Sequence, residues 1–294
     1  MSAVAASHRE PPARIDLHAH TTASDGTLTP AELVRAAAAA GLDVIAITDH
    51  DTTAGWEAAA AARPAGVTVI RGAELSCRWF GRASSISLHL LAYLFDPTEP
   101  ALVAELARLR TARERRAERI VQQLRADGFP VSWDDVLTAA AGGIVGRPHI
   151  AQALLAAGLV TTVDEAFSPR WLGERYRLPK DDMDVVTAVR LVRGAGGVPV
   201  LAHPRARRRG RVAPDALIVE LARAGLIGLE VDHADHAPDD REHLRRLAAR
   251  LGLVVTGASD FHGANKTVPL GAHTTTPAAL ERLVAAASGV PVLG

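Results

Sequence analysis

Short apolar runs alternate with amphipathic stretches over most of this chain. The runs are rich in β-branched residues and typical of buried strands, and they occupy residues 44–48, 67–70, 86–93, 198–202, 227–231 and 253–257. Between them lie stretches with apolar residues at helical intervals, at 182–194, 214–224 and 238–251. Such alternation of strand and helix predicts an α/β fold with a largely parallel sheet.

The first part of the chain continues the same alternation. Thr29, Pro30 and Glu32 supply a capping residue, a proline at the first helical position and a glutamate at the third, so a helix is expected to run to Gly41. Further helices are expected at 53–62 and 277–287. With a first strand that includes His18, we count seven strands, one short of an eight-stranded barrel.

The pattern changes after Pro97. A long charged helix is predicted at 100–127, since it carries Leu102, Leu106, Leu109, Ile120 and Leu124 at helical intervals. Shorter helices and an irregular stretch follow. We therefore expect a discontinuous barrel domain, a helical insertion that forms a lid and a substrate-phosphate site, and a loose tail, with these bounds: barrel 14–98 and 179–294, insertion 99–178, tail 1–13.

Composition limits the classes of function. The chain has 294 residues, 48% of them apolar, and 33 basic residues balance 33 acidic ones, so it lacks the overall positive charge of a dedicated nucleic-acid binder. One cysteine, Cys77, excludes an internal disulfide framework. No stretch resembles a signal peptide or a membrane span, so we expect a cytoplasmic protein with no membrane contact and no obligate protein partner.

Two segments near opposite ends of the chain carry complementary metal-ligand residues. Successive side chains of an extended segment point to opposite sides, so His18 and His20 project the same way, and so do Asp260 and His262. Further ligand-type residues follow or lie within the apolar runs, namely His50, Glu74, His89 and His203. Because the loops after parallel barrel strands meet at one mouth, these side chains are expected to converge there.

This constellation resembles a known family. The segments His18-Ala19-His20, Ser24-Asp25-Gly26, Thr48-Asp49-His50-Asp51, Gly72-Ala73-Glu74, His89, Ala202-His203-Pro204 and Ser259-Asp260-Phe261-His262 are similar, in order, to the motifs of the PHP (polymerase and histidinol phosphatase) metal-dependent phosphoesterases. The resemblance implies a distorted seven-stranded (β/α) barrel with a site for three divalent cations. Imidazole and carboxylate ligands suit Mn²⁺ or Zn²⁺, with Fe²⁺ and Mg²⁺ as alternatives.

The resemblance also implies which of these residues bind which metal. It implies a first metal held by His18, His20, Glu74 and Asp260, a second held by Glu74, His89 and His203, and a third held by Asp25, His50 and His262. Asp25 stands where many members have an imidazole, and this variant resembles the nucleotide-directed branch. Members of that branch remove a phosphate from nucleoside 3′,5′-bisphosphates or trim short RNA from its 5′ end.

The hypothesis is that a metal-bridging hydroxide attacks a terminal phosphate of a small nucleotide, with short RNA as a second substrate class. Asp260 and His236 are assigned catalytic roles; either His233 or His236 could reach the mouth as the general acid, and His236 is preferred. Substrate phosphate is expected to meet Arg147, His149, His233 and Lys180. Asp16, Asp49, Asp51 and, less directly, Asp232 are interpreted as partners that orient the ligand imidazoles.

Four alternatives stay open. A 5′–3′ exoribonuclease could use the same site, whereas a histidinol-phosphatase-like enzyme fits the insertion and Asp25 less well. A non-catalytic metal-binding scaffold is disfavoured because every ligand position is filled. A metal-dependent amidohydrolase usually has a lysine on a barrel strand, and neither Lys180 nor Lys266 lies in an expected strand.

Overall fold

The computed structural model of the protein describes residues 13–81 and 85–294. All but one residue of the expected tail therefore lies outside the described residues. In the described part of the chain the sheet has eight strands: β1 Ile15–Asp16, β2 Val44–Ile47, β3 Thr68–Phe80, β4 Ser85–Tyr93, β5 Met183–Asp184, β6 Val198–Leu201, β7 Gly228–Asp232 and β8 Val254–Gly257.

Seven of these strands form a nearly closed barrel. They are hydrogen-bonded in the order β1-β2-β3-β4-β6-β7-β8. The two-residue strand β5 lies off this path and pairs in parallel with β3. The ends of the path approach each other just beyond β1 and β8, where Ala19 and Phe261 form a parallel bridge. The expected seven-stranded α/β barrel is confirmed.

One strand of the barrel runs against the others. β4 is antiparallel to both β3 and β6, so the largely parallel sheet that was expected is mixed at this strand. β3 is thirteen residues long and continues past the barrel mouth, and β4 runs back beside it. His89 of β4 consequently lies opposite Ser76 of β3, close in the sheet to Glu74.

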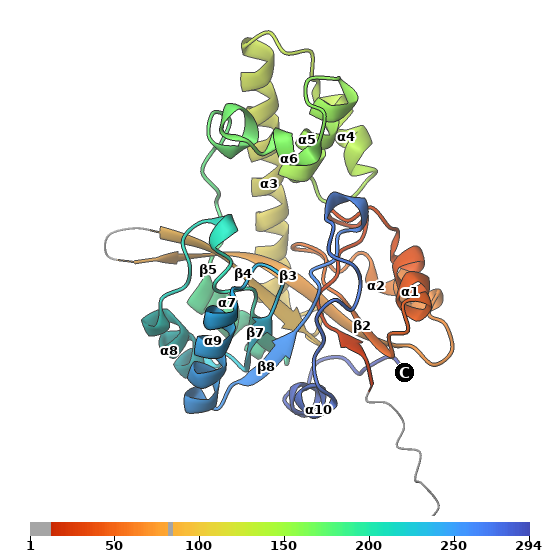
Figure 1. Ribbon diagram of the computed structural model, residues 1–294, viewed down its shortest axis with the longest axis vertical. Coiled ribbons are helices and arrows are strands. Elements are labelled where there is room, and N and C mark those ends of the chain that lie inside the picture. Colours follow the sequence, from red (N-terminus) through yellow and green to blue (C-terminus); the bar gives the residue numbers. More distant parts are fainter. Residues whose placement is uncertain (1–12, 82–84) are drawn as a thin grey trace, which may run out of the picture.

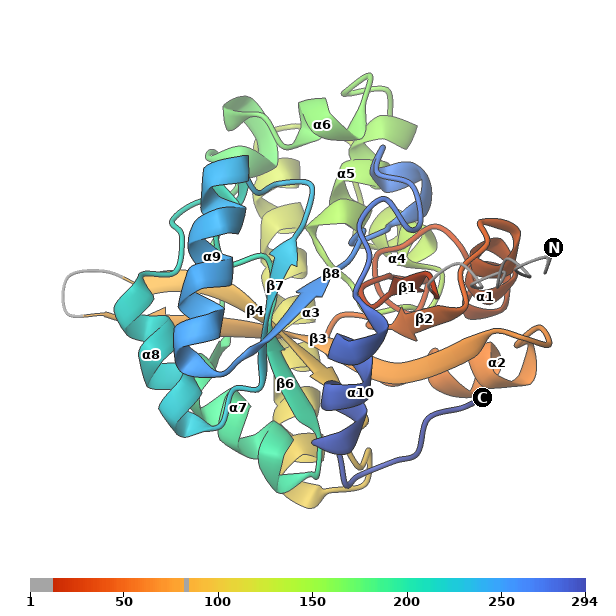
Figure 2. The ribbon, with the colours of Figure 1, turned by 60° about the horizontal axis from the view of Figure 1, so that its bottom comes forward.

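The helices either cover the outside of the barrel or form a separate unit beside it. They are α1 Pro30–Ala39, α2 Trp56–Ala61, α3 Pro100–Ala126, α4 Trp133–Ala140, α5 Arg147–Ala156, α6 Val163–Ala166, α7 Val185–Gly194, α8 Asp215–Ala224, α9 Pro238–Leu251 and α10 Pro277–Ala285. α7, α8 and α9 line one side of the sheet and α1 and α2 the other (Figure 2). Thr29 and Glu32 form the expected capping box at the start of α1.

The strands bury both of their faces. In β2, Ile45 and Ile47 pack against the surrounding helices, while Val44 and Ala46 point into the barrel beside Ile70. All four β2 side chains are buried, as expected of a strand covered on both sides. The buried barrel strands end in the loops that carry the polar cluster described below.

The helices between β4 and β5 form a separate body, which we call the helical unit (residues 100–173). α3 rises from the barrel, and α4, α5 and α6 pack around its far half (Figure 1). The unit has its own apolar core, which includes Ile120, Leu124, Ile150 and Trp171. No helix in the described part of the chain combines the length and apolar character needed to span a bilayer.

The helical unit touches the barrel beside the mouth. The Ile144 amide donates a hydrogen bond of 3.0 Å to the carbonyl oxygen of Ala23. Gly143 makes this approach possible, because a Cβ atom there would lie 2.2 Å from the carbonyl oxygen of Thr22. The loop that carries Asp25 is thus held between the barrel and the helical unit.

Candidate metal centre

The loops at the barrel mouth bring four buried side chains to one point. His18 and His20 follow β1, Glu74 lies on β3 and Asp260 follows β8. Glu74 Oε2 lies 3.3 Å from His18 Nε2 and 3.2 Å from His20 Nε2, and Asp260 Oδ1 lies 3.3 and 3.4 Å from the same two nitrogens. We call these four residues the first group.

The first group fits a divalent cation. Donors about 2.1 Å from a tetrahedrally bound ion are about 3.4 Å apart, close to the separations found here. Among the described residues, His18 Nε2 and His20 Nε2 are buried and have no hydrogen-bond partner, which is costly unless an ion accepts their lone pairs. The donor set contains no thiolate and suits Zn²⁺, Mn²⁺ or Fe²⁺.

Glu74 connects the first group to a second one. Its Oε1 atom lies 2.7 Å from His89 Nδ1 and 3.0 Å from His203 Nε2, while Oε2 faces the first group. His50, Glu74 and His89 have donor atoms within 4.8 Å of one another. His50 also adjoins this group, with Nδ1 3.2 Å from Glu74 Oε2, while His203 contacts the same oxygen as His89.

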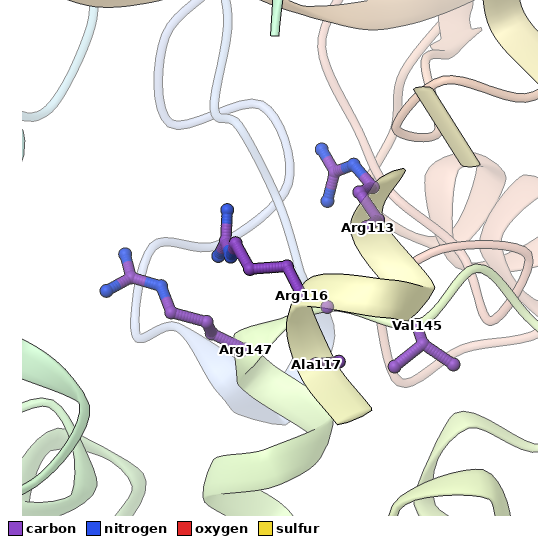
Figure 3. Close-up of a pocket in the computed structure, with 6 residues that line it drawn as sticks. Arg113, Arg116, Ala117, Val145 and Arg147 are labelled. Atoms are coloured by element: carbon purple, nitrogen blue, oxygen red, sulfur yellow. The ribbon is translucent and has the colours of Figure 1, made fainter. Parts of the chain in front are cut away.

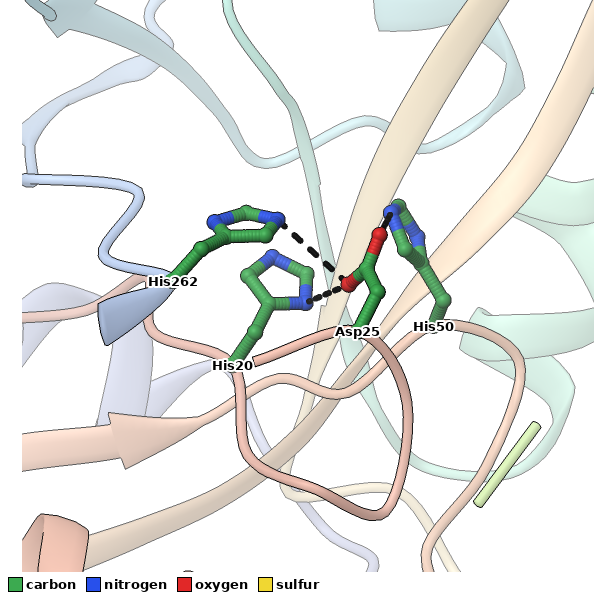
Figure 4. Close-up of side chains that lie close together, drawn as sticks. All are labelled: His20, Asp25, His50 and His262. Carbon is green, nitrogen blue, oxygen red and sulfur yellow. Dashed lines mark ion pairs between the residues drawn. The ribbon is translucent and has the colours of Figure 1, made fainter. Parts of the chain in front are cut away.

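A third group surrounds Asp25. Oδ1 of Asp25 lies 3.4 Å from His262 Nε2 and 3.6 Å from His20 Nδ1, and Oδ2 lies 3.7 Å from His50 Nε2 (Figure 4). His20, Asp25, His50 and His262 have donor atoms within 4.8 Å of one another. The structure therefore brings all nine sequence-identified ligand residues into one continuous cluster.

The charges of the cluster favour cation binding. Burial lowers the pKa of His50 well below its usual value and that of His262 to about 3. Burial would raise the pKa of Glu74, but His89, His18 and His50 outweigh it, and the pKa falls well below its usual value. The pKa of Asp25 is likewise lowered, since His50 and His262 outweigh burial.

Strained backbone lies at the same place. Asp51, His203 and Asp260 have φ angles of 54°, 28° and 53°, in the left-handed region that non-glycine residues rarely adopt. Such a conformation costs about 1–2 kcal/mol for an ordinary residue and less for Asp. Surrounding contacts must hold it; the His203 amide, for example, donates to Glu230 Oε2 at 2.8 Å.

Glu230 is a functional residue that the sequence reasoning missed. It lies fully buried on β7, and its Oε1 atom accepts a 2.9 Å hydrogen bond from His18 Nδ1. That bond keeps the proton on Nδ1 and directs the Nε2 lone pair into the first group. The available signal was a carboxylate between Leu229 and Val231 in an otherwise apolar strand.

The acids expected to orient imidazoles instead hold the loops. Asp16 accepts from the amides of Ser259 and Gly271, and Asp49 accepts from the Thr21 amide and hydroxyl and from the Ser24 hydroxyl. Asp51 accepts from the Ser76 amide and from Arg113. Asp232 pairs with Arg245 on the outer surface. These acids therefore fix the chain segments that carry the ligand residues, and they do not orient the imidazole rings.

The assignment of His236 as general acid does not agree with the structure. His236 Nδ1 donates to the carbonyl oxygen of Val231 at 2.8 Å, and Nε2 accepts from the Arg205 amide at 3.1 Å. Both nitrogens are therefore occupied by backbone groups. His233 accepts the Asp235 amide at Nδ1, so its Nε2 carries the proton, which faces Asp260 Oδ2 at 3.3 Å.

A second cluster of charge lies where α3 meets α5. Arg113, Arg116 and Arg147 line a small cavity with Ala117, Val145 and Gly146, and the three guanidinium groups point toward the same side (Figure 3). We call these three residues the arginine cluster. Arg113, which sequence reasoning did not single out among the many arginines, also bonds to Asp51 and Ser76.

Burial of several like charges is unfavourable in this cluster. Burial, with Arg147 and Arg113 nearby, lowers the pKa of Arg116 to about 10, and burial lowers that of Arg147 as well. Within the described ranges, neither Arg116 nor Arg147 forms an ion pair with a carboxylate. An anion bound here would relieve the repulsion.

Lys180 and His149 differ in their positions. Burial lowers the pKa of Lys180 to about 8, and the same three arginines contribute, so it belongs to the same positive region. His149 is buried, accepts the Gly146 amide at Nδ1 and bonds to the backbone of Ser24. It therefore anchors α5 to the Asp25 loop rather than facing an anion, contrary to expectation.

Several known proteins are similar to this chain over most of its length. A family model described as PHP domain matches residues 16–129. A 5′–3′ exoribonuclease of Haemophilus influenzae is 37% identical over 85% of this chain and 90% of its own length. A 3′,5′-nucleoside bisphosphate phosphatase of Chromobacterium violaceum is 36% identical over 85% and 87%. A solved structure from Bifidobacterium adolescentis, provisionally described as a metal-dependent phosphoesterase, is 38% identical with a TM-score of 0.88 and covers 95% of this chain and 98% of that one.

Proposed function

This chain belongs to the PHP family of metal-dependent phosphoesterases, and from that premise we propose that it removes a phosphate from a nucleoside 3′,5′-bisphosphate. The observation that carries the proposal is the pair of adjacent clusters: a buried set of imidazole and carboxylate donors, and a positive cluster in which Arg116 and Arg147 pair with no carboxylate of the described residues. One suits the reacting phosphate and the other a second phosphate.

The residues assigned to hold divalent cations are the three groups at the barrel mouth. They are His18, His20, Glu74 and Asp260; Glu74, His89 and His203; and Asp25, His50 and His262. When bound, divalent cations polarise phosphoryl oxygens and lower the pKa of water toward neutrality, so that water can attack without a covalent enzyme intermediate. Mn²⁺ and Zn²⁺ are our first choices for these positions.

The chain's own residues orient and enclose the reacting phosphate. Glu230 holds the proton of His18 on Nδ1, and Asp49 and Asp51 hold the loops beside His20 and His50. His233 carries its proton at Nε2, facing the centre, and we assign to it the hydrogen bond to a substrate or leaving oxygen that the sequence suggested for His236. The helical unit, within the expected insertion 99–178, excludes water from one side.

The arginine cluster would select the substrate. Arg113 lies near enough to Asp25 and His50 to influence the pKa of both, so the cluster adjoins the third group. Planar guanidinium groups bind phosphate oxygens through two hydrogen bonds at once. A nucleotide with phosphates at both ends of its ribose could place one at the metal centre and the other at Arg116 and Arg147.

The alternative substrate is short RNA with a 5′-phosphate. A relative bears the name 5′–3′ exoribonuclease, and the loop after His203 exposes Arg207, Arg208 and Arg211, which could contact further phosphates of a longer chain. Arg207 also pairs with Asp240, so this loop is a weaker anion site than the buried cluster. Both activities could use one metal centre.

The test compares phosphate release from four substrates, each with Mn²⁺ and with Zn²⁺. They are 3′-phosphoadenosine 5′-phosphate, adenosine monophosphate, histidinol phosphate and a short RNA with a 5′-phosphate. We expect the highest kcat/KM for the bisphosphate. Fastest turnover of the RNA would favour the alternative, and fastest turnover of histidinol phosphate, or no release from any substrate by metal-loaded protein, would refute the proposal.

A variant pair tests the arginine cluster. Arg116→Ala is expected to raise KM for the bisphosphate by about 10–150-fold, because a charged hydrogen bond contributes about 1.5–3 kcal/mol. KM for a monophosphate should change little. Arg115→Ala is the matched control, since Arg115 is exposed on the same helix. Equal increases of KM for both substrates would contradict phosphate selection by this cluster.

A further inference from the structure

The two oxygens of the Asp260 carboxylate face different partners. Oδ1 faces the first group and lies 3.3 Å from His18 Nε2 and 3.4 Å from His20 Nε2. Oδ2 points away from that group and lies 2.7 Å from Lys266 Nζ and 3.3 Å from His233 Nε2. One oxygen therefore faces the proposed cation, and the other meets an ammonium group.

Lys266 contacts Asp260 twice. Its Nζ atom also lies 3.3 Å from the main-chain carbonyl oxygen of Asp260, so a single ammonium group contacts the backbone and the side chain of one residue. Asp260 has the left-handed φ angle of 53°, and a flexible turn could release it. The double contact stabilises the orientation in which Oδ1 faces the histidines.

The turn that carries Lys266 is itself anchored. The Lys266 amide bonds to the carbonyl oxygen of Gly263, and the Ala264 amide donates to Thr27 Oγ1 at 2.9 Å. Asn265 donates to the carbonyl oxygen of Asp25 at 2.9 Å and accepts from Gln152 of α5 at 3.2 Å. The ammonium group is thus positioned from a turn fixed to the Asp25 loop and to the helical unit.

We propose that Lys266 is a positioning residue of the metal centre: it holds Asp260 Oδ2 so that only Oδ1 serves as a metal donor. This inference rests on the metal centre of the proposed function. Without the ammonium group, Oδ2 keeps the longer contact with His233 Nε2 at 3.3 Å but loses its 2.7 Å ion pair, so the carboxylate can rotate more easily and the ion loses a fixed ligand. Partners of this kind typically change metal affinity by about 10–100-fold.

Two other roles would leave different signatures. The Lys266 side chain is 31% exposed, so it could bind substrate phosphate directly; its loss would then raise KM and leave metal affinity unchanged. If it served only to stabilise the turn, its loss would lower the melting temperature and leave metal affinity unchanged. Neither role predicts a loss of metal binding in protein that carries no substrate.

The experiment measures metal affinity without substrate. Purified apoprotein is titrated with Mn²⁺ and with Zn²⁺ against a competing chelator, for the wild type, Lys266→Met and Lys266→Arg. We expect Lys266→Met to bind the first ion about 10–100-fold more weakly and Lys266→Arg to stay within a few-fold of the wild type. At saturating metal, kcat should fall for Lys266→Met while KM for the nucleotide stays unchanged.

Lys180→Met is the matched control, because Lys180 is the only other lysine of the chain and its ammonium group contacts Ser87 and Asp182 rather than the metal donors. Its metal affinity should equal that of the wild type. If Lys266→Met does not fold, Lys266→Gln, which stays polar but loses the charge, carries the same expectation. Unchanged metal affinity in folded Lys266→Met or Lys266→Gln would overturn the proposal, whether KM rises or the melting temperature falls.

These outcomes separate this inference from the proposed substrate. Weakened metal binding in Lys266→Met would support the positioning role even if the wild type showed no activity on a bisphosphate. Normal metal binding in that variant would overturn it even if the bisphosphate proved the best substrate. A wild-type protein that binds no divalent cation would refute the metal centre itself and this inference with it.

Discussion

Replacing Glu230 by glutamine tests whether a carboxylate behind His18 prepares it to bind a metal. The substitution conserves shape and removes one charge from a fully buried position on β7. The Glu230 carboxylate accepts from His18 Nδ1 at 2.9 Å and from the His203 amide at 2.8 Å. A glutamine can accept only through its carbonyl oxygen, so one of these two bonds is lost or reversed.

The size of the effect follows from that bond. If the NH₂ group of the introduced glutamine faces the ring, His18 must accept at Nδ1 and carry its proton at Nε2, the atom that faces Glu74 and Asp260. A hydrogen bond to a charged group contributes about 1.5–3 kcal/mol. At about 1.4 kcal/mol for each factor of ten, metal binding should weaken by about 10–150-fold.

The assay is chelator competition on apoprotein, followed by phosphate release at saturating metal. Circular dichroism verifies that the variant is folded. Glu220→Gln, an exposed position on α8, is the control for loss of one carboxylate. Metal affinity of folded Glu230→Gln equal to that of the wild type would refute the reasoning that His18 is a ligand oriented by Glu230.

Three further predictions concern pH, metal removal and the helical unit. Because the pKa of Lys180 lies at about 8, the free enzyme loses this charge above that pH, so KM for the bisphosphate should rise several-fold between pH 7 and pH 9; Lys180→Arg should flatten the rise, and an identical profile in that variant would exclude Lys180 as the cause. Removing metal with a chelator should lower the melting temperature, since ligand at about 100 times Kd stabilises by about 2.7 kcal/mol; a melting temperature independent of metal would contradict a built site. Ile120→Ala should destabilise the helical unit by about 2–5 kcal/mol and raise KM for the nucleotide without changing metal affinity; loss of metal binding instead would show that the helical unit supports the ligands directly.

The fold and the ligand positions were predictable for definite reasons. Short β-branched runs such as 44–48 and 198–202 specify buried strands, and the period-two spacing of His18 and His20 placed both rings on one side. The structure brings both Nε2 atoms within 3.4 Å of Glu74 and Asp260. The positions of the remaining ligands were predictable from the order of the motifs, because the loops that follow barrel strands converge.

Other features were not predictable, since they depend on three-dimensional context. The apolar run at 86–93 has no mark of strand direction, so the antiparallel course of β4 was missed. Arg113 is one of many arginines on a charged helix, and only the packing of α3 against the barrel brings it to Asp51. His236 and His149 precede or follow loops near the mouth, but local backbone groups occupy their nitrogens.

The most direct test of the account is a crystal structure of the metal-loaded protein with anomalous scattering recorded at the Mn and Zn absorption edges. The account predicts anomalous peaks between His18, His20, Glu74 and Asp260, and beside Asp25, His50 and His262. Metal ions bound at full occupancy elsewhere on the protein, with no anomalous peak among these side chains, would contradict the central claim that these residues form the metal centre of a phosphoesterase.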